Sequence, residues 1–501
     1  MQPYSITASM LYNLVSCEHR LYLDTFGDAS QRDEPNAFIQ LLWEKGTLFE
    51  QEVIQKLETP FLDLSRYRGD EKERRTREAI EQRVSLIYSG RLSVNDLLGE
   101  PDLLRNDGEG YVAGDIKSGS GEEGDEDQGK PKKTYAVQLG LYTDILERLN
   151  CSAGRWAFIW DIHGKEIRYE FSQPQGRRTP ETWWELYNTV RQRAQDILEQ
   201  RHETQAAYSS GICKLCHWYR PCLLNLQKQH DLTLLPELGR SKRDALRTHF
   251  STIQNFAASD LKSLINGKKT IISGIGLGTI QKLHARAQLV SAGAHARPYL
   301  REAIDLPAHD SEVFFDIEVD PLRDHTYLHG FIERHHQDHS TEQYVAFFAE
   351  NPTPDAEQTA FAQAIEYLQQ HAHSMVYYYS KYERTMYRKL QTKYPDVCSA
   401  DDIETLFLRE RAIDLYFDVV LKATEWPTRD YSIKTLAKYL GFLWRDTHPS
   451  GAASIEWFHR WVESGDQIIR QRILDYNEDD CIATRVLLDG IRKLPIKTSN
   501  P

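Results

Sequence analysis

The sequence has 501 residues, of which 40% are hydrophobic and 27% are charged, and this predicts a globular protein of more than one domain. No run approaches the roughly 18 apolar residues of a membrane span, and the N-terminus lacks a signal-peptide pattern, so we expect a cytoplasmic protein without membrane contacts. The net charge of -13 argues against a protein that coats nucleic acid indiscriminately.

Residues 1–230 are predicted to form the first domain, and a strand-like run at 110–117 is its most informative segment. Side chains alternate along a strand, so Asp115 and Lys117 share one face. Asp102, after Pro101, comes from the preceding segment and adds a second carboxylate. Close carboxylates repel one another unless a cation lies between them, which favours a divalent ion such as Mg or Mn. Lys117 is then available to orient the nucleophile or to stabilise the transition state.

Two further residues lie four apart on one predicted helical face, Gln138 and Tyr142. With Pro101-Asp102 and Asp115-x-Lys117 they resemble the motifs of the PD-(D/E)XK superfamily, in its RecB-like branch. The resemblance implies a catalytic role for all of these polar residues and for Glu50, although the histidine common in that early motif is absent. Residues 118–133 are rich in Gly, Ser and acids and are expected to form a mobile loop.

A cysteine cluster follows, Cys213, Cys216 and Cys222, and Cys17 near the N-terminus is the expected fourth ligand. In a cytosolic protein this spacing favours a metal over disulfides. Thiolates bind either zinc or an iron–sulfur cluster, and nearby histidines at 19 and 217 suit zinc. The arrangement resembles iron–sulfur RecB-like nucleases, including CRISPR-associated exonucleases, and this resemblance implies a 4Fe–4S cluster.

Residues 231–304 are predicted to form a basic connector, with ten Lys and Arg against four Asp and Glu in 231–300. Residues 235–246 and 272–283 repeat at a spacing of 37, and each copy places a glycine turn before a helix. The pattern resembles a tandem helix-hairpin-helix. It implies phosphate contacts through the second copy, since glycine lets backbone amides approach an anion closely. The alternative is a pair of ordinary helical hairpins. The expected nucleic-acid-binding residues are Gly274, Gly276, Gly278 and Lys282.

Residues 305–501 are predicted to form the last domain, with a mixed sheet covered by helices. In the strand 311–319 the apolar residues face one side, while Asp316 and Glu318 face the other. Further strands are expected at 327–332, 344–348 and 374–379, with helices at 355–370 and 382–393. Tyr476 and Asp480 lie four residues apart and are expected to open a late helix.

These residues resemble the DnaQ-like, or DEDD, 3′-to-5′ exonucleases of the ribonuclease H fold. Asp316-x-Glu318 matches the first motif, and Tyr476-x-x-x-Asp480 matches the third motif of the tyrosine subtype. The second motif is altered, with Glu383 in place of an aspartate. The resemblance implies two divalent ions, Mg or Mn, held by these four carboxylates, and a water oriented by Tyr476. Asp414 is an alternative ligand.

The whole chain resembles RecB-like nucleases that join an iron–sulfur PD-(D/E)XK domain to a DnaQ-like domain. The leading hypothesis is a metal-dependent nuclease of DNA, on single strands or ends, in repair, recombination or defence. A non-catalytic nucleic-acid-binding adaptor and an RNA-processing exonuclease are the alternatives. No Gly-x-x-x-x-Gly-Lys-Ser/Thr loop is present, so any helicase is expected to be a separate partner.

Overall fold

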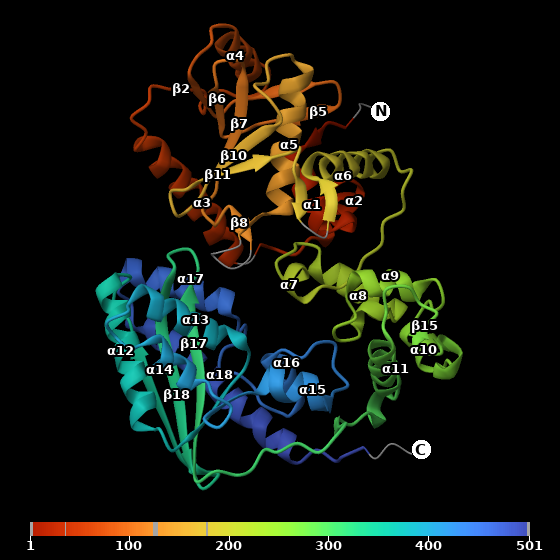
Figure 1. The fold of residues 1–501 in the computed structure, drawn as a ribbon, viewed down its shortest axis with the longest axis vertical. Coiled ribbons are helices and arrows are strands. Elements are labelled where there is room, and N and C mark those ends of the chain that lie inside the picture. Colours follow the sequence, from red (N-terminus) through yellow and green to blue (C-terminus); the bar gives the residue numbers. More distant parts are fainter. Residues whose placement is uncertain (1–3, 36, 124–128, 177–178, 498–501) are drawn as a thin grey trace. The chain divides into compact units, whose positions relative to one another are not determined.

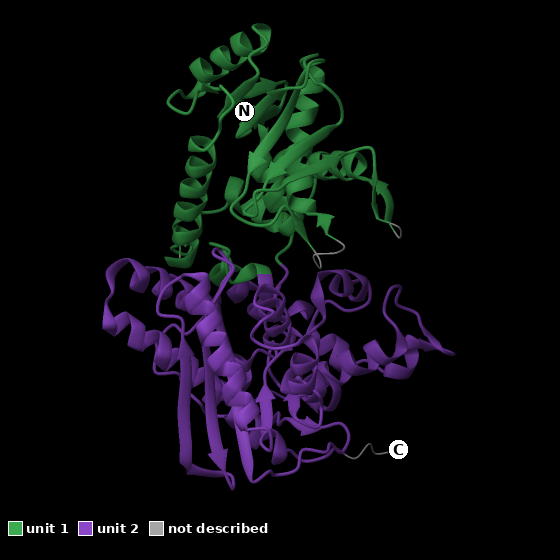
Figure 2. Cartoon of the chain, turned by 60° about the vertical axis from the view of Figure 1, so that its left-hand side comes forward, with its two compact units in different colours: residues 1–206, 212–222 green, residues 207–211, 223–501 purple. Residues whose placement is uncertain are grey.

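The computed structural model describes residues 4–35, 37–123, 129–176 and 179–497 (Figure 1). The chain forms two compact units (Figure 2). Unit 1 consists of Met1–Ala206 and Ile212–Cys222, and unit 2 of Ala207–Gly211 and Leu223–Pro501. The predicted connector is therefore grouped with the C-terminal part of the chain.

Unit 1 is built on a six-stranded mixed sheet of order β11-β10-β7-β6-β3-β2. Its strands are β2 (Leu62–Asp63), β3 (Leu86–Tyr88), β6 (Leu103–Asn106), β7 (Tyr111–Ile116), β10 (Trp156–Trp160) and β11 (Glu166–Glu170). A smaller sheet has the order β1-β5-β4, from β1 (Ile6–Thr7), β4 (Leu92–Val94) and β5 (Leu97–Gly99). The central strand β7 pairs antiparallel with β6 and parallel with β10, and all six of its residues are buried.

The helices of unit 1 are α1 (Ala8–Ser16), α2 (Glu18–Phe26), α3 (Ala37–Gln55), α4 (Gly69–Glu81), α5 (Lys133–Arg148), α6 (Trp183–Leu198) and α7 (Ser210–Cys213). The short helix η1 (Ala29–Gln31) and the hairpin of β12 (Pro174–Gly176) and β13 (Thr179–Thr182) complete the unit. Helix α5 packs on β7, β10, α1 and α6, which explains why its residues are buried on nearly every side.

Unit 2 contains a second mixed sheet of order β19-β18-β17-β20-β21. Its strands are β17 (Ser311–Asp320), β18 (His325–His335), β19 (Asp338–Phe348), β20 (Met375–Tyr378) and β21 (Ala412–Asp414). The first three strands form an antiparallel meander, and β20 and β21 extend it in parallel with β17. Strands β16 (Tyr299–Leu300) and β22 (Thr424–Glu425) form a separate pair.

Helices cover this sheet on both faces. They are α12 (Pro354–Gln370), α13 (Lys381–Lys393), α14 (Ala400–Leu406), the π-helix η6 (Leu415–Val420), α15 (Leu421–Ala423), α16 (Ile433–Tyr439), α17 (Gly451–Ser464) and α18 (Gln467–Arg492). One apolar cluster joins α12 and α13 to the face of β17 that carries Phe315, and another joins α18 to the face that carries Phe314. The alternation predicted for this strand is confirmed.

The predicted connector is mostly helical. It contains α9 (Gly239–Arg247), α10 (Ile253–Ala257) and α11 (Leu277–Ser291), with the short helices η3 (Leu232–Leu234), η4 (Leu261–Leu264) and η5 (Gly293–His295) and a small hairpin of β14 (Ile265–Asn266) and β15 (Lys269–Thr270). Helix α8 (Tyr219–Gln229) precedes it.

The strands and helices predicted for the C-terminal domain are confirmed as β18, β19, β20, α12 and α13. The prediction that Tyr476 opens a helix is wrong, because α18 begins nine residues earlier, at Gln467. Asp466 caps it by accepting a hydrogen bond from the Ile468 amide, and Gly465 ends the preceding helix in the left-handed conformation, with φ 68°.

The segment 118–133, expected to be a loop, contains two short paired strands, β8 (Glu122–Glu123) and β9 (Lys130–Pro131). Residues 124–128, on which the expectation of mobility chiefly falls, lie outside the described residues.

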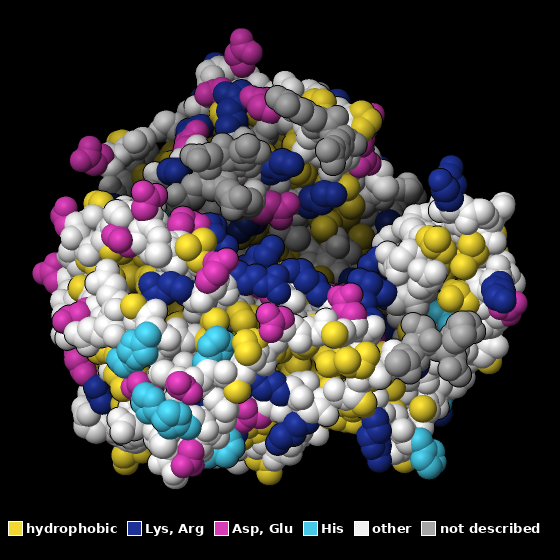
Figure 3. All heavy atoms as spheres, turned by 60° about the horizontal axis from the view of Figure 1, so that its bottom comes forward, with side chains coloured by type: hydrophobic (Ala, Val, Ile, Leu, Met, Phe, Trp, Pro, Cys, Tyr) yellow, Lys and Arg dark blue, Asp and Glu magenta, His cyan; other side chains and the backbone are white. Residues whose placement is uncertain are grey.

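The face drawn in Figure 3 shows basic, acidic and apolar side chains interspersed, so the net charge of -13 is not spread as a uniformly acidic surface there. In the described part of the chain, no helix has the length and apolar character that a membrane span needs.

Candidate active sites

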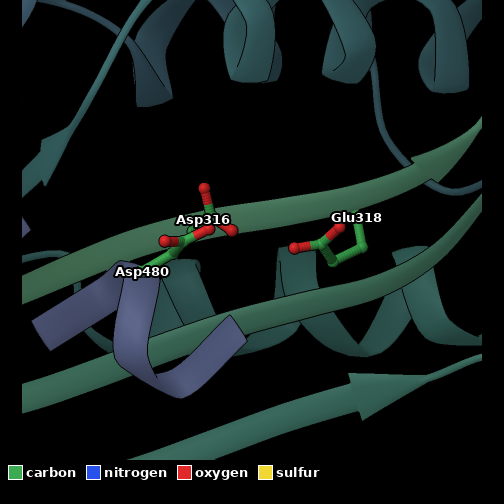
Figure 4. Close-up of side chains that lie close together, drawn as sticks. All are labelled: Asp316, Glu318 and Asp480. Atoms are coloured by element: carbon green, nitrogen blue, oxygen red, sulfur yellow. The ribbon is translucent and has the colours of Figure 1, made fainter. Parts of the chain in front are cut away.

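Three carboxylates converge in unit 2. One oxygen from each of Asp316, Glu318 and Asp480 lies within 4.8 Å of the others, and in the described ranges no other set of three potential ligand groups is as close. Figure 4 shows Asp316 and Glu318 leaving β17 and Asp480 leaving α18 toward the same space. The two-residue period of a strand and the packing of α18 on β17 bring them together.

Neighbouring side chains fix the orientation of these carboxylates. Asn477 Nδ2 donates a hydrogen bond to Asp316 Oδ2 at 2.9 Å, and Asn477 Oδ1 accepts one from Tyr344 OH at 2.8 Å. Each chain of hydrogen bonds limits the rotamers open to a carboxylate, which pre-organises the group. Asp316 is therefore anchored through α18 and β19.

The other two carboxylates also accept hydrogen bonds. Tyr327 OH donates to Glu318 Oε2 at 3.3 Å, and Trp444 Nε1 donates to Asp480 Oδ1 at 2.7 Å. Each carboxylate has further lone pairs that these single donors do not use. Such oxygens are the donor atoms that hard divalent cations prefer, so the three residues fit an Mg or Mn ion.

The electrostatics support the same conclusion. Burial, and then the charge of Asp480, raise the pKa of Glu318 to about 8. Burial, followed by the charges of Asp480 and Glu318, raises the pKa of Asp316 well above its ordinary value. Buried like charges favour protonation unless a cation compensates them, so a divalent ion and protons compete for this site.

This competition predicts an unusual pH dependence of stability. Because the pKa of Glu318 is raised from 4.5 to about 8 on folding, the stability gained by protonation is fully present below 4.5 and is lost as the pH rises through 8. Each pH unit in that window costs about 1.4 kcal/mol. Without divalent metal, we expect the unfolding free energy of the native protein to fall more steeply with pH than that of Glu318→Gln. Chemical denaturation of both proteins across the window measures this.

Saturating Mg should remove most of the difference in slope, because the cation replaces the protons. Equal slopes for the native protein and Glu318→Gln in EDTA would show that Glu318 titrates normally.

Glu383 also belongs to this region. It lies buried on α13, and burial, then the charge of Asp414, raise its pKa to about 8. Its charge is felt at Asp316, although Glu383 lies outside the tight set of three. Asp414 has a different task, because it accepts hydrogen bonds from the amides of Tyr416 and Phe417 and so caps η6. The ligand role of Glu383 stays a prediction.

One basic residue in this site was missed by sequence reasoning. Lys434, on α16, donates a hydrogen bond from Nζ to Tyr476 OH at 2.6 Å and lies 3.3 Å from Asp480 Oδ2. It therefore holds the tyrosine hydroxyl beside the carboxylates. A single lysine in a short helix 42 residues upstream belongs to no motif, so no local signal indicated it.

Unit 1 contains a second carboxylate pair. Asp115 is buried on β7, and Asp102 lies just before the neighbouring strand β6. Asp102 Oδ2 accepts a hydrogen bond from the Ile116 amide at 2.8 Å, and the Asp102 amide donates to Asp115 Oδ1 at 3.3 Å. The antiparallel pairing of β6 with β7 therefore brings the two acids together, as the sequence predicts.

Lys117 completes this arrangement. Its Nζ lies 2.9 Å from Asp115 Oδ2. Burial would lower the pKa of Lys117, but the charges of Asp115 and Asp102 outweigh burial and raise it, so the ammonium form is favoured. Burial and the charge of Asp115 raise the pKa of Asp102. Two buried acids with one ammonium group fit a divalent cation with oxygen ligands.

The remaining residues predicted for this site also lie near it. On α5, Gln138 Nε2 donates to Tyr142 OH at 3.4 Å, and after burial the charge of Asp115 is the main cause that raises the pKa of Tyr142. On α3, Glu50 Oε1 accepts a hydrogen bond from Tyr88 OH at 2.8 Å, and its charge is felt at Asp102. Their catalytic roles stay predictions.

A support for Asp102 was missed by sequence reasoning. Ser89 has a positive φ of 58°, unusual for a residue other than glycine. Its amide donates to the Asp102 carbonyl at 2.7 Å, and its Oγ accepts from buried Lys72 Nζ at 2.8 Å. This backbone conformation is a tertiary effect without a sequence motif.

Comparison with protein families agrees with both sites. Residues 19–222 match the PD-(D/E)XK nuclease superfamily, and residues 313–491 match the RNase H superfamily. The chain joins two nuclease-superfamily domains. They support a divalent-metal-dependent nuclease, and hence a nucleic-acid substrate. A search of curated proteins finds no significant match to the chain.

The PD-(D/E)XK domain also brings the four predicted cysteines into one region. After burial, the charges of Cys17, Cys216 and Cys213 are the largest causes that raise the pKa of Cys222, to about 12. In the described residues, no three of these sulfurs lie within 4.8 Å of one another. A zinc tetrahedron holds its thiolates about 3.8 Å apart, from Zn–S bonds near 2.3 Å. The thiols are therefore neighbours without forming a compact tetrahedral set.

The two histidines considered as zinc ligands have other partners. His19 Nδ1 lies 2.9 Å from Thr204 Oγ1, and His217 Nε2 lies 2.6 Å from Asp24 Oδ1. Trp218 Nε1 donates to the same Asp24 oxygen at 2.8 Å. These contacts hold the cysteine loop against α2.

The repeat in the connector has a structural counterpart, although a helix-hairpin-helix is not confirmed. Glu237 and Gly274, which are equivalent at the spacing of 37, both have positive φ, 59° and 76°. A Cβ at Gly274, Gly276 or Gly278 would meet no atom within 4 Å, and Lys282 is exposed on α11. The predicted phosphate contacts therefore have open space around them.

Proposed function

We propose that the protein is a divalent-metal-dependent nuclease of DNA that degrades single strands or ends and has a separate site in each domain. The observation that carries this proposal is the convergence of Asp316, Glu318 and Asp480 within 4.8 Å. Tyr476, one helical turn before Asp480, is its neighbour in the site. We place the activity in repair, recombination or defence of DNA, with any strand separation supplied by a separate helicase.

In the RNase H domain the three carboxylates, with Glu383, would hold the ions. A bound divalent ion would lower the pKa of water and neutralise charge on the phosphoryl group. Tyr476, whose hydroxyl is held by Lys434, would orient the attacking water. Hydrolysis from 3′ ends is the polarity we assign to this site.

In the PD-(D/E)XK domain Asp102 and Asp115 would hold the ion. Lys117 would orient the nucleophile or stabilise the negative charge of the transition state, because its ammonium form is favoured there. Gln138, Tyr142 and Glu50 border this site and are assigned to substrate or ion positioning. Gly274, Gly276, Gly278 and Lys282 would contact phosphates without reading sequence.

The test is a time course with single strands labelled at either the 5′ or the 3′ end, of DNA and of RNA, with Mg, Mn or EDTA. We expect metal-dependent degradation of DNA strands, with duplex DNA degraded from frayed ends. Preferential digestion of RNA would favour an RNA-processing exonuclease. Binding without any hydrolysis would favour an adaptor.

We further propose that Cys17, Cys213, Cys216 and Cys222 bind a 4Fe–4S cluster that staples the N-terminal helices to the end of the domain. Their proximity and the absence of a compact tetrahedral set in the described residues support this assignment over zinc, because each cysteine of such a cluster binds a different iron.

Protein purified without oxygen is expected to show the broad visible absorption of a thiolate-bound cluster, and Cys222→Ser should lose this absorption and the bound iron. The buried Cys481→Ser, in the other unit, is the matched control and should retain both. Zinc at one equivalent in place of iron would contradict the cluster.

A further inference from the structure

Unit 1 contains a cavity of about 480 Å³ that borders the cysteine region. Its walls combine aromatic rings with basic side chains, and it lies outside both carboxylate sites. The aromatic residues are Tyr12, Trp43 and Tyr219, and the basic residues are Arg20, Lys214 and Arg220.

The aromatic side chains of this cavity are unusually exposed. Trp43, on α3, is 63% exposed, and Tyr12, on α1, is 37% exposed. Large apolar side chains that remain in water at a concave site commonly mark a binding surface. Rings of this kind stack on unpaired bases of any sequence, because every base has a π-face.

The basic residues suit the backbone of a strand. Lys214 and Arg220 are exposed, and the only carboxylate printed near Arg220 among the described residues is Asp33, with Oδ1 3.6 Å from its Nε. An exposed pair of this length is weak and can exchange for a phosphate contact. Asp33 and Glu34 also line the cavity, so its charge is mixed rather than strongly basic. This favours binding that depends on stacking as well as on charge.

An aromatic path joins the cavity to the catalytic lysine of the same domain. The Tyr12 and Tyr135 rings lie 6.1 Å apart, and Lys117 Nζ lies 5.8 Å from the centre of the Tyr135 ring. On α3, a Cβ at Gly46 would lie 3.8 Å from Ser118 Oγ, directly after Lys117. The helix that carries Trp43 therefore passes beside the end of the catalytic strand.

We propose that this cavity binds unpaired nucleotides of the substrate strand, and that Tyr135, Tyr12 and Trp43 stack its bases on the way to the PD-(D/E)XK site. The proposal rests on the proposed nuclease function and deepens it. It gives the site a physical reason to select single strands, because paired bases cannot offer their faces to the rings.

Photo-crosslinking tests the position of the strand. Single strands that contain iododeoxyuridine, or iodouridine in a parallel RNA arm, are irradiated with the full-length protein without divalent metal, and the modified peptides are mapped. We expect crosslinks at Trp43 or Tyr12, and the stronger arm identifies the polymer. Crosslinks confined to other parts of the chain would overturn the proposal.

A kinetic test uses the background Asp316→Asn, which isolates the PD-(D/E)XK activity. We expect Trp43→Ala to raise KM for single strands about tenfold with a smaller change in kcat, and Trp43→Phe to restore most of the loss. Lys214→Ala should raise KM and reduce its salt dependence. The control is Leu48→Ala, on the same helix, 49% exposed and outside the cavity walls, which should leave KM unchanged.

The outcomes separate the two proposals. If the parent protein cleaves strands but Trp43→Ala and Tyr12→Ala keep its KM, the cavity is not a strand subsite and the nuclease assignment stands. If the native protein neither cleaves nor crosslinks to any strand, the proposed function fails and the subsite fails with it.

Discussion

Asp316→Asn is expected to lower metal-dependent release of nucleotides from 3′ ends by on the order of 10²–10³-fold while leaving the fold intact. The substitution keeps the shape of the side chain, and an amide oxygen can still accept the hydrogen bond from Asn477. It removes one of the three charges that would hold the ions. The rate of mononucleotide release from a 5′-labelled single strand measures the loss.

The same variant should be more stable than the native protein in EDTA. The charges of Asp480 and Glu318 disfavour ionisation of Asp316, so replacing this acid relieves a repulsion between buried groups. We therefore expect a higher unfolding temperature without metal, together with the loss of activity. A stability gain without a loss of activity would place the catalytic ions elsewhere.

A buried acid on the same strand is the matched control. Asp320 lies two residues beyond Glu318 and is fully buried, but its Oδ2 lies 2.8 Å from His459 Nε2. Its hydrogen bond with His459 outweighs burial and holds the pKa of Asp320 below its usual range. Asp320→Asn should therefore lower stability and retain activity, the opposite of Asp316→Asn on both measurements.

Periodicity made the core of this site predictable. The alternation at 311–319 placed Asp316 and Glu318 on one face of β17, and the four-residue spacing placed Tyr476 and Asp480 on one face of α18. Both patterns depend on a single element, which a sequence displays directly. The residues that complete the site could not be predicted, because Trp444, Lys434 and Asn477 reach it only through packing between elements.

The misplaced start of α18 has a related cause. Acidic residues favour the first turn of a helix, so the run 478–480 suggested a helix start. In the structure, Arg445 compensates these acids, with Nη2 2.7 Å from Glu478 Oε2 and Nε 2.9 Å from Asp479 Oδ1. An ion pair between distant segments therefore allows acids in the middle of a helix, and local charge patterns cannot show such a pair.

The repeat in the connector shows what periodic similarity does predict. Leu235 and Leu238 in the first copy, like Ile272 and Ile275 in the second, are buried in one apolar cluster. The equivalent positions share a positive φ even though the first copy has Glu237 where the second has glycine. Similarity of burial and backbone was therefore predictable, whereas the binding of phosphate depends on exposed amides and needs its own test.

Lys117→Ala is expected to lower the activity of the PD-(D/E)XK domain by on the order of 10²–10³-fold when measured in the Asp316→Asn background. The loss should appear in kcat at saturating metal, because Lys117 contributes its ammonium group and is not assigned as an ion ligand. A titration with Mg or Mn before the kinetic measurement ensures that the ion site is filled.

A stability effect should accompany this loss and should depend on metal. Without its partner at 2.9 Å, the buried Asp115 carboxylate is left uncompensated in EDTA, which destabilises a folded protein by about 3–5 kcal/mol. A bound divalent ion would supply the missing positive charge, so saturating Mg should restore most of the unfolding free energy and none of the activity. Lys165→Ala removes the same charge from an exposed position of the domain and should change neither. Recovery of activity together with stability in Mg would show that Lys117 only stabilises the fold, whereas recovery of stability alone assigns its charge to the chemistry.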